Sequence, residues 1–262
     1  MAFALKARRI PGTKDTPDAK VEVANLLAAV RQSKLSRVFL SSEELFSCPP
    51  EAIAWLKTEL GADQVDFLTF LRRPDTFLVS CYNQKMRQPG NGFASPISRF
   101  VKAPKQIAPE IDYFACINAW AEVFGDDRIT VGTYEAGSPL VATLKHLGLP
   151  PGLLQDDPTV NRSLPGAVVE TMRYAKTIGM PVDHQRRLLK LASEVFADGA
   201  PFYMADQDRI SIIGAFEAAN TTLFKRFGAK NPYAKRAFVP VAPLQEYNLK
   251  HSDLLRIVGR LF

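Results

Sequence analysis

Apolar runs alternate with amphipathic segments along the first 150 residues. Residues 65–71 form a nearly continuous apolar run, which is typical of a strand with both faces covered in a parallel sheet. Shorter apolar segments at residues 38–40 and 128–135 predict two further strands. Between them, apolar residues recur at helical spacing, and proline and glycine mark helix starts and ends. The helices predicted in this part are 18–33, 50–61, 74–87 and 113–125.

This order of elements predicts the fold class. Strand, helix, strand, helix and strand with short connections indicate an α/β protein, in which helices flank a doubly wound parallel sheet. From about residue 150 the pattern is helical, and we expect this half to pack against the sheet rather than form a separate domain. Its predicted helices are 164–176, 184–196 and 207–227. The predicted organisation is a loose leader (1–17), an α/β domain (18–228) and a C-terminal tail (229–262).

Charge and composition narrow the classes of partner. The 262-residue chain has 33 lysines and arginines against 27 acidic residues, a net charge of +6 that favours anionic ligands. No more than two basic residues stand next to each other, so we expect no nucleic-acid partner. The three cysteines show no metal-ligand spacing, and we expect no metal. No apolar run reaches the ~18 residues that span a bilayer, and no secretory signal is seen, so we expect no membrane insertion and a cytoplasmic location.

Two adjacent arginines end the apolar run at residues 65–71. Arg72 and Arg73 directly follow it, and a helix is predicted to start at Pro74. Ligands of parallel sheets bind outside the carboxyl ends of strands, and the first N–H groups of a helix attract anions. An arginine fork binds two phosphate oxygens at once, and Ser80, in the second turn of the helix, is placed to reach the same anion. A second interpretation stays open, in which the arginines pair with Asp or Glu.

A resemblance to a known family favours the first interpretation. The segment "FLRRPDTFLVSCYNQ" resembles the 3′-phosphate-binding motif of sulfotransferases that use 3′-phosphoadenosine 5′-phosphosulfate (PAPS). The motif is an apolar strand, Arg, a variable residue, Pro, and a Ser eight positions after the Arg. Arg72, Pro74 and Ser80 match it, whereas Arg73 stands where the family often has Asp.

Other segments resemble bacterial members of the same family, so that the likeness covers roughly residues 38–228. They are "VFLSSEELF", "YFACINAWAEVFGDDRITVGTYE" and "VNRSLPGAVVETMRYAK". The resemblance implies a P-loop NTPase-like sulfotransferase fold with PAPS as co-substrate and no metal. It implies that Arg72 and Ser80, with Arg73 beside them, bind the nucleotide.

One part of the family pattern is not found. Family members begin with a strand and a Gly-, Lys- and Ser/Thr-containing loop, which binds the 5′-phosphosulfate. "RIPGTKDTPD" contains Gly12 and Lys14, but no apolar strand precedes it. We therefore expect the first strand, loop and helix to be absent. Two explanations stay open: a shortened form of a larger sulfotransferase, or a degenerate member that kept the fold and lost the chemistry.

The acceptor side needs a general base, because sulfuryl transfer to a hydroxyl releases a proton. In the family this base is His or Glu, and Glu43, after the predicted strand at 38–40, is our candidate catalytic residue. Tyr82, Gln84 and Lys85 follow Ser80 on its helix and are the candidate acceptor-binding residues, although Tyr82 also fits ordinary helix packing.

The predicted function is transfer of a sulfuryl group from PAPS to a hydroxyl of a carbohydrate or other cell-surface precursor. The alternative is a non-catalytic, degenerate member that acts as a nucleotide- or anion-binding or scaffold protein. The missing loop favours this alternative, because it would supply the main donors to the charge that develops in the transition state.

Overall fold

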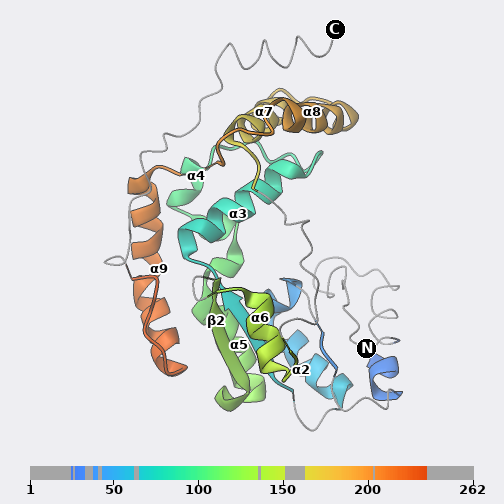
Figure 1. The fold of residues 1–262 in the computed structure, drawn as a ribbon, viewed down its shortest axis with the longest axis vertical. Helices are drawn as coiled ribbons and strands as arrows, with labels where there is room; N and C mark the ends of the chain where they lie inside the picture. Colours follow the sequence, from blue (N-terminus) through green and yellow to red (C-terminus); the bar gives the residue numbers. More distant parts are fainter. Residues whose placement is uncertain are drawn as a thin grey trace. The chain divides into compact units, whose positions relative to one another are not determined.

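The computed structural model describes residues 25, 27–32, 38–40, 43–61, 65–134, 137–150, 163–202 and 204–234. Figure 1 shows its helices and strands and labels several of them; together they make this an α/β protein. The chain divides into two compact units. The first comprises Met1–Leu71, Asp112–Gly148 and Ala219–Asn231, and the second Arg72–Ile111, Leu149–Ala218 and Pro232–Phe262.

The sheet of the first unit consists of two parallel strands in the described part of the chain. Strand β1 (Phe67–Leu71) pairs with β2 (Ile129–Thr133), in a register that places Phe70 opposite Gly132. A Cβ atom on Gly132 would lie 2.6 Å from a ring carbon of Phe70. Glycine at this position therefore leaves room for the aromatic ring on the neighbouring strand.

Helix α5 packs on this sheet. The Trp120 ring stacks on Phe67 with ring centroids 4.3 Å apart, and its indole N–H donates to the carbonyl of Leu45 at 3.0 Å. The Asp112 carboxylate caps the start of the helix by accepting from the Ala115 N–H. The helical elements of this unit include η1 (Glu43–Ser47), α2 (Pro50–Leu60), α5 (Tyr113–Phe124), η4 (Asp126–Arg128) and α6 (Pro139–His146).

The second unit is helical, and its core is built around α3. This helix starts at Pro74, where proline is favoured because the first N–H groups have no intrahelical partner. Leu78, Tyr82 and Met86 project from it into a cluster with Val168 and Met172 of α7. The helical elements of this unit are α3 (Pro74–Arg87), α4 (Ser98–Val101), η2 (Pro104–Gln106), η3 (Pro109–Ile111), α7 (Gly166–Thr177), α8 (Val182–Val195) and most of α9 (Asp206–Arg226).

The structure confirms most of the predicted elements. The strands at 65–71 and 128–135 are present as β1 and β2, and six predicted helices, from 50–61 to 207–227, lie within two residues of α2, α3, α5, α7, α8 and α9. Residues 25 and 27–32 are helical, whereas residues 18–24, 26 and 33 of the first predicted helix lie outside the described residues. The predicted leader, residues 1–17, also lies outside them.

The strand predicted at residues 38–40 is wrong, because these residues are described and form no strand. An apolar run of three residues indicates burial, but a strand also needs a neighbour for its N–H and C=O groups. The structure thus shows the α/β class, and the parallel sheet in the described part of the chain has two strands where a doubly wound sheet was expected. The P-loop NTPase-like sulfotransferase fold stays a prediction.

Candidate anion-binding pocket

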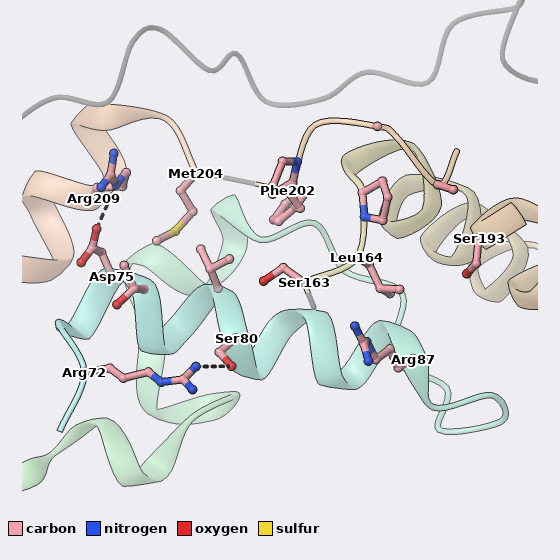
Figure 2. Close-up of a pocket in the computed structure, with 16 residues that line it drawn as sticks. Arg72, Asp75, Ser80, Arg87, Ser163, Leu164, Ser193, Phe202, Met204 and Arg209 are labelled. Carbon is pink, nitrogen blue, oxygen red and sulfur yellow. Dashed lines mark hydrogen bonds and ion pairs between the residues drawn. The ribbon is translucent and has the colours of Figure 1, made fainter. Parts of the chain in front are cut away.

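A pocket of about 760 Å³ lies within the second unit. Sixteen residues line it (Figure 2), and all of them belong to that unit. They come from α3 and from Arg72 before it, from α8, from the start of α9, and from residues within 163–165, 197–202 and 204. Helix α3 forms one wall, so the arginine motif and the pocket are positioned by the same element.

Arg72 and Ser80 lie together at this wall. The guanidinium Nη1 of Arg72 donates a hydrogen bond to the Ser80 hydroxyl oxygen at 3.2 Å. Figure 2 shows the arginine side chain lying along α3 with its guanidinium next to Ser80. Both residues are half-buried and both line the pocket. The two side chains predicted to bind one anion therefore point to the same place, at the edge of a cavity.

Arg73 is directed to a carboxylate. Its Nε and Nη2 donate to the two oxygens of Asp75 at 2.7 and 2.9 Å. Asp75 is 1% exposed and also accepts from Nε of Arg209 at 2.9 Å. Arg209 in turn donates to Asp206 at 2.9 Å. These four charges join the start of α3 to the start of α9, and Arg73 does not line the pocket. The geometry of Arg73 therefore supports the second interpretation of the sequence, in which the arginines pair with Asp or Glu.

The predicted acceptor-binding residues are not brought to the pocket. Tyr82 is fully buried, stacks on Phe202 with centroids 5.3 Å apart, and donates its hydroxyl to the carbonyl of Ser95 at 3.0 Å. Gln84 is exposed and Lys85 half-buried, and neither lines the pocket. Tyr82 therefore has the core position that the packing alternative predicts.

The candidate base, Glu43, is the first residue of η1 in the first unit. Its side chain lies outside the described part of the chain. Its catalytic role therefore stays a prediction.

Several lining residues were not predicted. Arg87 could have been found from the local sequence. Ser80 follows Thr76 by four residues and Arg87 follows Ser80 by seven, which are spacings that place side chains on one face of a helix. Ser163 stands in the "VNRSLPG" segment, whose family likeness was noted without a role. Ser193 and Arg209 come from distant parts of the chain, and no local pattern connects them to α3.

The lining favours a negatively charged ligand. It contains Arg72, Arg87 and Arg209, whereas Asp75 is the one carboxylate among the residues that line it. Both oxygens of Asp75 accept from arginines, so this carboxylate is neutralised locally. Guanidinium groups bind phosphate and sulfate oxygens through directed hydrogen bonds. The chemistry available here is therefore binding and orientation of an anion.

A buried lysine fixes the end of α3. Lys176 of α7 is 7% exposed, and its ammonium donates to the carbonyls of Lys85 and Gln88 and to the side-chain oxygen of Asn91, at 2.6–3.0 Å. These oxygens use all three donors of the ammonium group. Burial, with a smaller effect of the Lys85 charge, lowers the pKa of Lys176 to about 8.

This lowered pKa predicts a pH dependence of stability. Between pH 8 and the ordinary lysine pKa of 10.5, the folded protein has lost the Lys176 proton whereas the unfolded chain retains it. The free energy of unfolding should therefore rise with pH across this interval. We expect the rise in wild type and not in Lys176→Met, measured by urea denaturation from pH 7.5 to 10.5. Lys190→Met, at an exposed position of α8, is the control and should keep the rise; equal pH profiles for wild type and Lys176→Met would contradict the prediction.

Neither a metal-binding cluster nor a membrane-spanning helix is found among the described residues. No group of three or more His, Cys, Asp or Glu side chains is placed to hold a metal ion there. None of the described helices is long and apolar enough to cross a membrane.

Comparison with models of known protein families finds no match, and neither does comparison with curated proteins or with solved structures.

Proposed function

We propose that this protein is sulfotransferase-like and binds PAPS through Arg72 and Ser80, for transfer of the sulfuryl group to a hydroxyl of a carbohydrate or other cell-surface precursor. The observation that carries the proposal is the 3.2 Å hydrogen bond between the Arg72 guanidinium and the Ser80 hydroxyl at the wall of an arginine-rich pocket. The resemblance of "FLRRPDTFLVSCYNQ" to the 3′-phosphate motif of the family supports it.

The chemistry of the pair suits a ribose 3′-phosphate. Such a phosphate is close to doubly charged and accepts several hydrogen bonds, and Arg72 and Ser80 offer a planar fork and a hydroxyl from adjacent points. The pocket volume of about 760 Å³ falls in the usual range for small-molecule and cofactor sites. A nucleotide thus fits the charge and the size of the site.

In the proposed reaction, the bond between the sulfur of PAPS and the bridging oxygen to its 5′-phosphate breaks, and the acceptor oxygen forms a new bond to that sulfur. The acceptor proton passes to a base, for which Glu43 is the candidate. Arg72 and Ser80 bind the nucleotide away from the reacting atoms and orient it. Such orientation raises the rate because the reactants meet in a productive geometry.

A second candidate function is nucleotide or anion binding without catalysis. The observation that favours it is the burial and hydrogen bonding of Asp75. This carboxylate, the one among the residues lining the pocket, accepts from Arg73 and Arg209 and is 1% exposed. Both of its oxygens accept hydrogen bonds from guanidinium groups, so it is not placed to contact an acceptor hydroxyl. The pocket by itself then binds an anion and supplies no base.

The test is calorimetric titration with adenosine 3′,5′-bisphosphate. We expect binding to wild type, and a loss of about tenfold to a hundredfold in Arg72→Ala, because a charge-assisted hydrogen bond contributes roughly 1.5–3 kcal/mol. Ser80→Ala should lose less, because a neutral hydroxyl forms the weaker bond. Arg99→Ala is the matched control, since Arg99 is exposed and does not line the pocket.

The outcomes separate the two candidates. Absence of nucleotide binding, or equal affinities of Arg72→Ala and wild type, would rule out the proposed site. Binding that depends on Arg72, together with transfer of labelled sulfate from PAPS to an acceptor panel, supports the enzyme. Binding without transfer favours the non-catalytic candidate.

A further inference from the structure

Lys176 of α7 contacts the backbone on both sides of Arg87, the last residue of α3. Its ammonium donates to the carbonyl of Lys85 at 2.6 Å and to that of Gln88 at 3.0 Å. Arg87 lines the pocket, and Figure 2 shows it toward the end of α3 away from Arg72. Lys176 itself does not line the pocket. A residue outside the pocket is thus bonded to the segment that carries one of the pocket's arginines.

The end of α3 has one long backbone hydrogen bond and shorter bonds from side chains. Many helices end in a left-handed residue, usually glycine, whose N–H bonds the last free carbonyls. Here the residue after the helix, Gln88, is extended, with φ −96° and ψ 99°. Its N–H lies 3.4 Å from the Lys85 carbonyl oxygen, whereas the Lys176 ammonium lies 2.6 Å from the same oxygen. A cation at this end of a helix also interacts favourably with the helix dipole.

The segment after α3 is bonded to the same lysine. The side-chain oxygen of Asn91 accepts from Lys176 at 2.8 Å, and its amide donates to the Lys85 carbonyl at 2.7 Å. Gln185 of α8, which is buried, accepts from the Gly90 N–H at 3.1 Å. This segment and the last turn of α3 are therefore fixed to α7 and α8.

The ammonium group contributes direction rather than packing. Lys176 is 7% exposed, and burying an ammonium costs free energy that its three oxygen partners offset. A methionine would fill the space without that cost, but it would leave these oxygens without their donor. What the lysine adds is therefore attachment of the backbone that carries Arg87.

We propose that Lys176 is a positioning residue of the pocket. By bonding the carbonyls of Lys85 and Gln88, it sets the place and the order of the Arg87 side chain in the lining. Binding to a side chain that is already fixed in one place costs less conformational entropy, so the affinity for an anion should depend, through Arg87, on a lysine that does not touch the ligand. The inference rests on the proposed function for the ligand, whereas the order of Arg87 can be measured without one.

The first test is nuclear magnetic resonance relaxation of the arginine Nε–Hε groups, without ligand. In Lys176→Met the order parameter of Arg87 should fall by about 0.25 or more, the difference between an ordered and a flexible group. Arg72, whose guanidinium donates to Ser80, is the internal reference and should keep its value. Lys190→Met makes the same substitution at an exposed position of α8 and should change neither arginine.

The second test is a double-mutant cycle for the affinity of adenosine 3′,5′-bisphosphate, measured by calorimetry. Lys176→Met and Arg87→Gln should each weaken binding by about threefold or more, and the double variant should match Arg87→Gln within about twofold. This non-additivity is expected of a residue that acts through another, because a general loss of structure would weaken binding in either background.

Asn91→Ala carries both tests if Lys176→Met does not fold, which far-UV circular dichroism decides. Asn91 is exposed and supplies one of the three oxygens that bind the ammonium. Its replacement should give smaller changes in the same direction, again with no further effect on binding in the Arg87→Gln background.

The inference is overturned if Arg87 is as ordered in Lys176→Met as in wild type. It is also overturned if Lys176→Met binds the nucleotide as wild type does, or if this variant weakens binding equally with and without Arg87.

Failure of the inference is distinguishable from failure of the proposed function. If wild type does not bind the nucleotide, the proposed function fails, and the cycle is repeated with inorganic pyrophosphate. Non-additive pyrophosphate affinities, with a mobile Arg87 in Lys176→Met, then support the positioning role, and absence of binding to either anion rules it out. Nucleotide binding that depends on Arg72, with an ordered Arg87 in Lys176→Met, supports the proposed function and rules out the positioning role.

Discussion

Replacing Asp75 with alanine is expected to lower the free energy of unfolding by about 3–5 kcal/mol. Asp75 is 1% exposed and accepts hydrogen bonds from Arg73 and Arg209, and Arg209 is itself 5% exposed. Without the carboxylate, the buried guanidinium of Arg209 loses the anion that its Nε contacts, and water has little access to replace it. The measurement is urea denaturation, followed by circular dichroism.

Asp206→Ala is the control for this prediction, because it removes a carboxylate from the same arginine. The Asp206 side chain is 34% exposed, so solvent screens the pair and the cost should be about 1 kcal/mol or less. Asp75→Asn keeps the shape of the side chain and loses its charge. Its loss of unfolding free energy should lie between those of Asp75→Ala and Asp206→Ala. An Asp75→Ala protein within 1 kcal/mol of wild type would show that this network does not stabilise the second unit.

Replacing Tyr82 with alanine is expected to cost about 3–5 kcal/mol of unfolding free energy. The ring is fully buried in the core of the second unit and stacks on Phe202. Tyr82→Phe keeps the ring and loses the hydrogen bond to the Ser95 carbonyl, which costs about 1 kcal/mol. Gln84→Ala, two residues away and exposed, should change stability by less than about 0.5 kcal/mol.

The same variants decide between a core role and a substrate-contact role for Tyr82. Because Tyr82 does not line the pocket, Tyr82→Phe should bind adenosine 3′,5′-bisphosphate as wild type does. Loss of transfer activity or ligand binding in Tyr82→Phe, at unchanged stability, would favour the substrate contact predicted from the sequence. Urea denaturation and calorimetry on one preparation give both readouts.

Both large effects concern residues whose importance depends on partners far along the chain. Asp75 and Arg209 are 134 residues apart, and Tyr82 meets Phe202 across 120 positions. From the sequence, Asp75 is an acidic residue in the first turn of a helix, where its negative charge interacts favourably with the helix dipole. Its role as the centre of an arginine network is visible only when α9 is placed beside α3.

The amino-acid sequence by itself determined six of the helices (α2, α3, α5, α7, α8 and α9), the two parallel-strand segments and the meeting of Arg72 with Ser80. Each depends on neighbours within about two helical turns: proline opens α3, glycine follows α2 and α5, and an eight-residue spacing brings a guanidinium to a hydroxyl. Such features follow from local backbone geometry, so a pattern along the chain predicts them.

Only the tertiary structure decided which charges pair and which side chains line the pocket. The tertiary structure pairs Arg73 with Asp75, places Tyr82 in the core and brings Ser193 and Arg209 to the pocket wall beside α3. It also left residues 38–40 outside any strand. The physical reason is that hydrogen bonds and packing between distant segments depend on how whole helices pack against each other. The local pattern of apolar and polar residues does not specify which distant segment a helix will contact.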